Sequence, residues 1–114
     1  MSEIALNLTL YTKLEPVSGL FVEMQKSLRV AGDGEKYADL VITVNEGEDN
    51  ECTYIFELKY ATKSEATDTR IHGLITEAAD QVNKYRSSLE FRNRHVKAYA
   101  MIFAGSGCVY CEAP

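Results

Sequence analysis

A long amphipathic segment between two apolar segments is the feature that most constrains the fold of this 114-residue chain. Apolar side chains recur there at helical spacing over about five turns, at Ile71, Leu74, Ile75, Ala78, Val82, Tyr85 and Leu89. The segments on either side, residues 53–60 and 96–104, are rich in the apolar and aromatic residues typical of strands. A helix of this length can connect two parallel strands, so the sequence predicts a βαβ unit.

Two more extended segments precede this unit. Residues 20–30 and 37–44 have strand character, and the Ala-Gly-Asp-Gly between them is typical of a hairpin turn. The first half should therefore be a meander of three strands. Residues 2–15 fit strand alternation and helical spacing equally well, and periodicity leaves the choice open. Pro16 and Gly19 then break the chain.

The C-terminal part adds two strands to the predicted sheet. Residues 96–104 are almost continuously apolar, which favours a strand buried on both faces, and residues 108–112 follow as a short last strand. Asp68 or Thr69 is suited to cap the start of the long helix. We therefore expect one α/β domain over residues 1–114, with a central mixed sheet and helices on its faces.

Composition sets weak limits on function. The net charge of −5 argues mildly against nucleic-acid binding, which depends mainly on lysine and arginine. The sequence shows neither a signal-peptide pattern nor an apolar stretch long enough to span a membrane. A cytoplasmic protein without membrane association is the resulting expectation.

The three cysteines are expected to be free thiols, because their number is odd and no secretion signal is seen. Cys108 and Cys111 form a C-x-x-C pair, a spacing that also occurs in metal and redox sites. Here they fall in a predicted strand, where residues three apart point to opposite faces. We therefore expect both to be packing residues.

The strand at residues 53–60 carries two ionisable side chains among apolar ones. Glu57 and Lys59 share a face of that strand, and Asp39 enters the preceding strand on the face of Val41. If the two strands are neighbours, Asp39 and Glu57 converge. Two carboxylates beside a lysine can bind a hard cation such as Mg²⁺, which activates water and stabilises charge on a phosphate. The alternative interpretation is a structural Glu57–Lys59 ion pair at a half-exposed strand end.

A basic group near the end of the long helix is a second candidate. His95 lies among cationic residues that could contact phosphates, although charged surface faces are usually only solvated. The group comprises Lys84, Arg86, Arg92, Arg94 and Lys97.

Three stretches together resemble the PD-(D/E)XK nuclease superfamily. Residues 29–42 include the run Ala-Asp-Leu-Val-Ile, residues 54–59 read Tyr-Ile-Phe-Glu-Leu-Lys, and residues 78–85 contain Gln-x-x-x-Tyr. The similarity is greatest to a bacterial branch often attached to AAA-ATPase-like domains. It implies a restriction-endonuclease-like α-β-β-β-α-β core, an ATPase as a candidate partner and a first helix that is short or trimmed here.

The resemblance also implies roles for individual residues. Asp39 and Glu57 would ligate Mg²⁺, or Mn²⁺ in its place, and Leu58 would add its backbone carbonyl. Lys59 would assist the attacking water. Gln81 matches the glutamine of the helix motif, although it also fits an ordinary polar residue flanking the apolar stripe. Ala38 replaces the usual proline, and Glu3 best fits the acidic residue that the first helix of relatives carries.

Two further classes of function remain open beside a Mg²⁺-dependent nuclease acting on DNA. The same fold could be a catalytically inactive module that binds nucleic acid or protein. It could also be a structural subunit that forms a homodimer through a sheet edge or the first strand pair. Metal affinity that depends on Asp39 and Glu57 distinguishes the nuclease from the other two.

Overall fold

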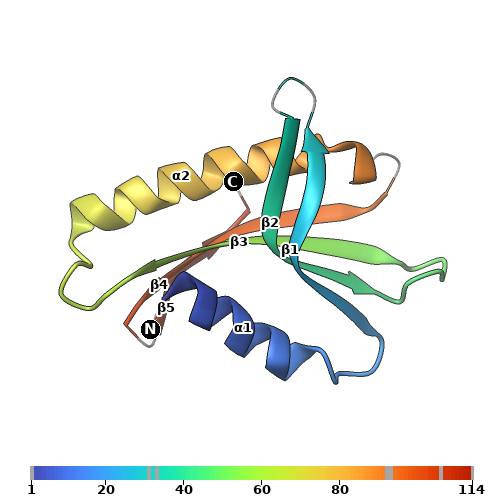
Figure 1. Cartoon of the computed structure of the whole chain (residues 1–114), viewed down its shortest axis with the longest axis horizontal. Helices are drawn as coiled ribbons and strands as arrows, with labels where there is room; N and C mark the ends of the chain where they lie inside the picture. Colours follow the sequence, from blue (N-terminus) through green and yellow to red (C-terminus); the bar gives the residue numbers. More distant parts are fainter. Residues whose placement is uncertain (1, 31, 33, 92–93, 106, 114) are drawn as a thin grey trace.

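A mixed five-stranded sheet forms the centre of the fold. The computed structural model describes residues 2–30, 32, 34–91, 94–105 and 107–113. The elements along the chain are α1 (Glu3–Leu14), β1 (Leu20–Val30), β2 (Gly34–Val44), β3 (Cys52–Ala61), α2 (Asp68–Arg86), the 3₁₀ helix η1 (Leu89–Phe91), β4 (Val96–Ala104) and β5 (Gly107–Glu112). The strand order is β1-β2-β3-β4-β5, with β3 and β4 parallel and the other neighbours antiparallel. The predicted α/β class, the strand meander and the parallel connection are confirmed (Figure 1).

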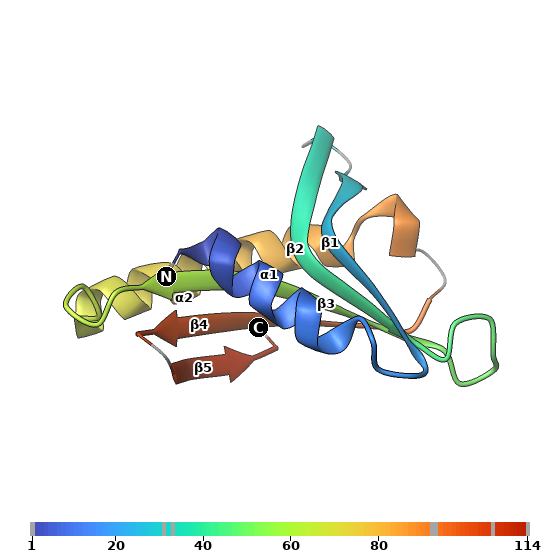
Figure 2. The same ribbon diagram turned by 60° about the horizontal axis from the view of Figure 1, so that its bottom comes forward.

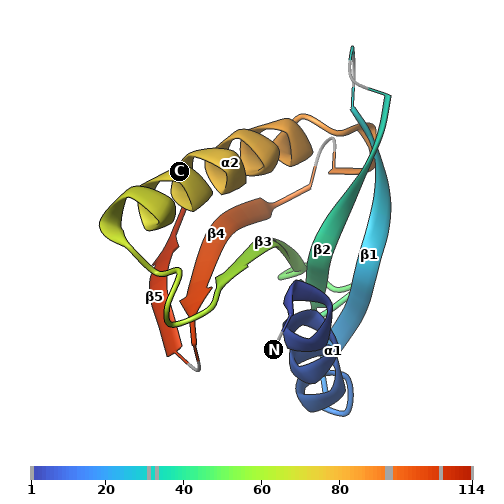
Figure 3. The same cartoon turned by 60° about the vertical axis from the view of Figure 1, so that its left-hand side comes forward.

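The ambiguous N-terminal segment is a helix. Ser2 caps it, because its hydroxyl accepts a hydrogen bond from the backbone N–H of Ala5, and Glu3 and Lys13 lie at the ends where their charges favour the helix dipole. Helix α1 lies on one face of the sheet and α2 on the other (Figure 3). This arrangement confirms helices on the faces of the sheet.

The main core lies between α2 and the sheet. The helix buries its apolar stripe of Leu74, Ala78, Val82 and Tyr85. This stripe belongs to a core cluster that includes Ile55 of β3 and Ala98, Ala100 and Ile102 of β4. The N-cap of α2 is Thr67, so the prediction of Asp68 or Thr69 is wrong by one or two residues. Thr67 is the capping residue because its backbone is extended and its side chain accepts a hydrogen bond from the Arg70 N–H.

Strand β4 is buried on one face only, which corrects the prediction of two buried faces. Ala98, Ala100 and Ile102 are fully buried beneath α2, whereas Tyr99 and Met101 on the other face are only partly covered. Helix α1 packs on that face mainly against β1, β2 and β3. Tyr99 stacks there on Tyr54 and Phe56 of β3.

The last strand contains a bulge that corrects the prediction for the cysteine pair. Cys108 pairs with Phe103, Tyr110 with Ile102 and Cys111 with Met101, so Val109 is the extra residue of β5. A bulge shifts the alternation of side chains by one position, which places Cys108 and Cys111 on the same face. Both cysteines are exposed, so they are not packing residues.

The hairpin of β1 and β2 divides from the rest of the sheet halfway along its length. Pairing between β2 and β3 ends at Leu40 and Phe56, whereas β1 and β2 remain paired as far as Val30 and Gly34. The distal half of the hairpin therefore bends away from β3 (Figure 2). It packs near η1, where the Glu90 carboxylate accepts a hydrogen bond from the Arg29 N–H. The predicted turn of residues 31–34 lies partly outside the described residues, since Ala31 and Asp33 are not among them.

None of the described helices has the length and apolar character needed to cross a membrane.

Candidate active site at the fork between β2 and β3

Strands β2 and β3 separate beyond the pair Leu40 and Phe56, and this point of separation, the fork, brings Asp39 and Glu57 together. Each residue is the next one beyond the last β2–β3 pair, Leu40 and Phe56. Their side chains are close enough for a side-chain hydrogen bond and for the charge of Asp39 to raise the pKa of Glu57. Glu57 is only 5% exposed, and Asp39 is partly buried.

Asp39 is held by three donors from three elements. Its Oδ2 accepts a hydrogen bond from the Leu58 backbone N–H at 2.8 Å, and its Oδ1 accepts from the Gln25 amide at 3.1 Å. The amide of Asn7 in α1 donates to the Asp39 backbone carbonyl at 2.7 Å. The side chain of Asp39 thus replaces the ladder bond that β2 would have supplied to Leu58. Its carboxylate is oriented before any ligand arrives.

Gln25 has a backbone conformation that few residues adopt. Its φ is +53°, in the left-handed region, and it falls between the Met24–Leu40 and Lys26–Ala38 pairs of β1 and β2. A non-glycine residue in this region costs on the order of 1 kcal/mol or more. Gln25 lies opposite Asp39 on the neighbouring strand, and in this conformation its amide donates to the Asp39 carboxylate.

Glu57 is surrounded by one hydroxyl and one cation. Tyr85 of α2 places its hydroxyl 3.1 Å from Glu57 Oε1 and 2.9 Å from the Tyr37 carbonyl, so its single proton is shared between two acceptors. The Lys59 ammonium lies 3.5 Å from Glu57 Oε2. Burial, followed by the charge of Asp39, raises the pKa of Glu57 to about 8 even though Lys59 opposes the shift. Burial and the nearby Glu57 also raise the pKa of Tyr85.

The donor set of the fork fits a divalent cation that keeps some of its water. The N–H and C=O of one strand residue point to the same side, so the Leu58 carbonyl faces the fork where its N–H meets Asp39. Beside the carboxylates of Asp39 and Glu57, this carbonyl makes three oxygen ligands. Within the described ranges no group of three or more His, Cys, Asp or Glu residues could hold a metal, so the other ligands would be water or substrate. Mg²⁺ accepts such a set, and a cation would balance two carboxylates that Lys59 neutralises only in part.

The predicted residues are not equally close to this site. Asp39, Glu57, Leu58 and Lys59 meet at the fork. Gln81 is half-buried on α2, one turn before Tyr85, and its side chain makes no hydrogen bond in the part of the chain that the structure describes. Glu3 does not join Asp39; its carboxylate accepts from the Tyr60 N–H at 3.2 Å.

Two residues at the site had no signal in the sequence. Asn7 is 3% exposed and its Oδ1 has no hydrogen-bond partner, but on a leucine-rich helix it looks like any polar residue. Gln25 lies in a strand whose alternation appears regular. Tyr85 belongs to the apolar stripe that the sequence predicted; it is buried on α2, and its hydroxyl reaches Glu57.

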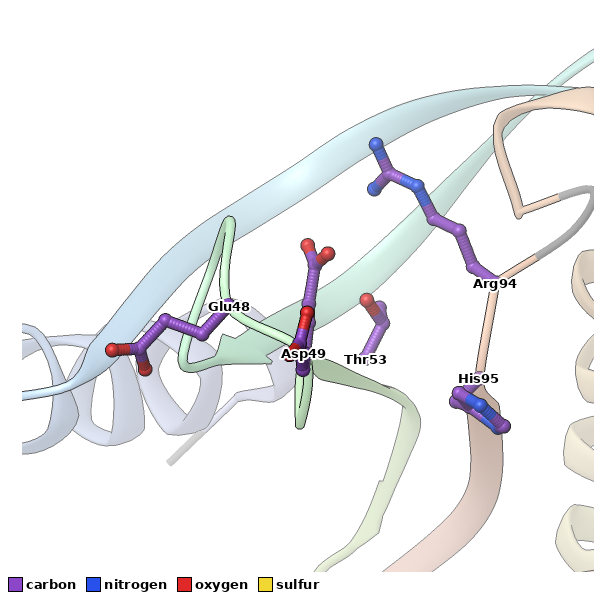
Figure 4. Close-up of a pocket in the computed structure, with 6 residues that line it drawn as sticks. Glu48, Asp49, Thr53, Arg94 and His95 are labelled. Carbon is purple, nitrogen blue, oxygen red and sulfur yellow. The ribbon is translucent and has the colours of Figure 1, made fainter.

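Members of the predicted basic group have separate contacts within the chain. Lys84 pairs with Asp80, and Arg86 donates to the Ala98 carbonyl and to Asn83. Arg94 and His95 line a pocket of about 130 Å³ with Thr53 and the acidic loop of Glu48, Asp49 and Glu51 (Figure 4). These carboxylates would repel a phosphate. Arg92 lies outside the described residues.

The fork defines a class of protein: a mixed α/β fold that presents two carboxylates, a lysine and a backbone carbonyl at the point where two strands separate. Such a donor set suits a divalent cation of the kind that hydrolytic enzymes use to activate water. The family follows from the comparison with known families, since the family model of the PD-(D/E)XK nuclease superfamily matches residues 29–113. The chain belongs to the PD-(D/E)XK nuclease superfamily, as the resemblance predicted. Searches of the curated proteins and of the solved structures found no match.

Proposed function

We propose that this chain, as one domain over residues 1–114, hydrolyses phosphodiester bonds of nucleic acid, with DNA as the substrate and Mg²⁺ or Mn²⁺ as the cofactor. The observation that supports this proposal best is the meeting of Asp39, Glu57 and Lys59 at the fork of a chain that belongs to a nuclease superfamily. An isolated structural ion pair between Glu57 and Lys59 would not require Asp39. Asp39 nevertheless accepts hydrogen bonds from three donors, two at its carboxylate and one at its backbone carbonyl.

In this proposal the Asp39 and Glu57 carboxylates and the Leu58 carbonyl hold the cation. When bound, the cation lowers the pKa of water and stabilises negative charge on the phosphate. Lys59 orients the attacking water and stabilises the developing anion, because its ammonium already lies at the edge of the carboxylate pair. Gln81, one turn before Tyr85 on α2, is the additional polar residue that we assign to the site, as the family resemblance implies.

Cleavage by the Lys59→Ala variant tests this proposal. Plasmid and single-stranded DNA are incubated with Mg²⁺, Mn²⁺ or EDTA, and the initial rates are compared. We expect cleavage only with metal and a loss on the order of 100-fold in the variant, since one charged group at the reacting centre is removed. Lys13→Ala changes an exposed lysine of α1 and should cleave like the wild type. Equal rates for Lys59→Ala and the wild type would mean that a contaminant cuts the DNA.

Gln25 provides a second test, because its amide orients the Asp39 carboxylate and is not itself proposed to contact the cation or the substrate. Gln25→Gly removes the amide that donates to Asp39 and also relieves the strain of the left-handed backbone, whereas Gln25→Ala removes the amide and keeps the strain. We expect both variants to cleave DNA several-fold more slowly, with the glycine variant the more stable to heat. An alanine variant at least as stable as the glycine variant would contradict the assigned strain.

A catalytically inactive binding module is the second candidate, and the charge distribution favours it. The net charge is −5. Lys84 and Arg86 have contacts within the chain, with Asp80 and the Ala98 carbonyl, and Arg94 lines a pocket together with the acidic loop. Such a module would bind protein, including an ATPase partner or a second copy of the chain, through exposed apolar residues such as Phe21 and Tyr37. Folded protein that neither binds Mn²⁺ nor cleaves DNA would favour this candidate. Metal-independent binding of DNA that weakens with salt would instead identify a nucleic-acid-binding module.

A further inference from the structure

The bulge in β5 brings two thiols together outside the candidate active site. Cys108 lies opposite Phe103 and Cys111 opposite Met101, two residues apart on β4. Two residues along a strand span roughly 6.8 Å. That spacing is at the upper end of the Cα separations found in disulfides, about 4.4–6.8 Å. A C-x-x-C in a regular strand would instead place its sulfurs on opposite faces.

The side chains support this proximity independently of the strand register. The Cys108 thiol donates a hydrogen bond to the Tyr110 carbonyl at 3.3 Å, so its sulfur lies beside the peptide bond that leads into Cys111. The two thiols also interact electrostatically: burial, followed by the charges of Cys108 and Glu112, raises the pKa of Cys111. Both cysteines are unpaired and exposed on the edge strand, within reach of a small reagent.

We propose that Cys108 and Cys111 are a reversible redox site, in which a low-molecular-weight disulfide such as glutathione disulfide closes them into an intrastrand disulfide. The Cys108 thiolate attacks one sulfur of the reagent, forms a mixed disulfide and releases one small thiolate, which takes up a proton. Cys111 then loses its proton and attacks the Cys108 sulfur, releasing the second small thiol. Two protein thiols are oxidised to one disulfide, and one small disulfide is reduced to two thiols.

The raised pKa of Cys111 is consistent with this order of attack. A thiol that stays protonated is the poorer first nucleophile, and it becomes effective once the mixed disulfide lies beside it. Because the Cα spacing is at the upper limit, closure strains the strand and the product is readily reduced. The bulge at Val109 is the element that accommodates this change, at an outer edge of the sheet where β5 has a single strand neighbour.

The test uses the folded, reduced chain in a Cys52→Ser background, which removes the remaining, partly buried thiol. The protein is incubated with glutathione disulfide, and its intact mass is followed. We expect a loss of two hydrogen atoms, with no glutathione retained, and full recovery of the original mass with dithiothreitol. Cooperative thermal unfolding of the reduced protein, measured before the reaction, shows that the folded chain is the reactant.

Two matched variants separate closure from ordinary thiol oxidation. Cys108→Ser and Cys111→Ser each keep one thiol and should each retain one glutathione as a stable mixed disulfide. Retention of two glutathiones by the chain with both cysteines, disulfide-linked dimers, or closure only after unfolding in urea would each overturn the proposal.

Discussion

Asp39→Asn is expected to reduce metal-dependent cleavage on the order of 1,000-fold, the largest effect on activity that the site predicts. Asparagine has nearly the same shape, and its single side-chain oxygen can still accept from the Leu58 N–H. Its NH2 group then faces Gln25, whose amide can turn over to accept from it, so the fork should keep its geometry. What disappears is one of the two negative charges proposed to hold the cation. Cleavage should fall because binding of the cation falls, while folding is preserved.

The measurement pairs initial cleavage rates with Mn²⁺ binding, followed by calorimetry or by the spin resonance of the ion. Asp80→Asn is a matched control, because Asp80 is an exposed carboxylate on α2 that pairs with Lys84. The control should bind Mn²⁺ and cleave like the wild type. Wild-type Mn²⁺ affinity in Asp39→Asn would remove Asp39 from the proposed site.

Glu57→Gln is expected to stabilise the metal-free protein at alkaline pH, the largest effect on stability. The folded-state pKa of Glu57 is about 8, above the ordinary value of 4.5, so the folded state binds a proton that the unfolded state has already released between these values. The free energy of unfolding of the wild type therefore falls as pH rises from about 4.5 to about 8. Across the whole window this penalty is on the order of 5 kcal/mol, and glutamine removes it.

Denaturant unfolding in EDTA at pH 5, 7 and 9 measures this difference. Glu57→Gln should match the wild type near pH 5 and exceed it increasingly toward pH 9. Glu77→Gln, at an exposed position of α2, should follow the wild type throughout. Saturating Mg²⁺ should restore much of the wild type's lost stability at pH 9, because a ligand of the folded state stabilises it. A pH-independent difference would assign the effect to packing, since packing does not titrate.

The elements of this fold could be predicted because their signals are local. The apolar stripe of α2 and the two-residue alternation of β3 reflect which side chains share a face, and neighbouring residues decide that. The same alternation placed Glu57 and Lys59 side by side, and the adjacency of consecutive strands brought Asp39 toward them. Residues 2–15 escaped prediction because leucine-rich segments satisfy both periods. The helix is decided by the Ser2 cap and by packing against β1, β2 and β3.

By itself the sequence determined the α/β class, the succession of strands along the chain and the residues Asp39, Glu57 and Lys59 of the proposed site. Periodicity and chain order carry that information. Only the tertiary structure decided how the site is supported. Asn7 and Tyr85 reach Asp39 and Glu57 because α1 and α2 dock on opposite faces at the fork. Gln25 reaches Asp39 from its left-handed position on β1. The bulge at Val109 is likewise a product of pairing with β4, and it reverses the face that Cys111 would have had in a regular strand. Such contacts join residues distant in sequence, so no local pattern records them.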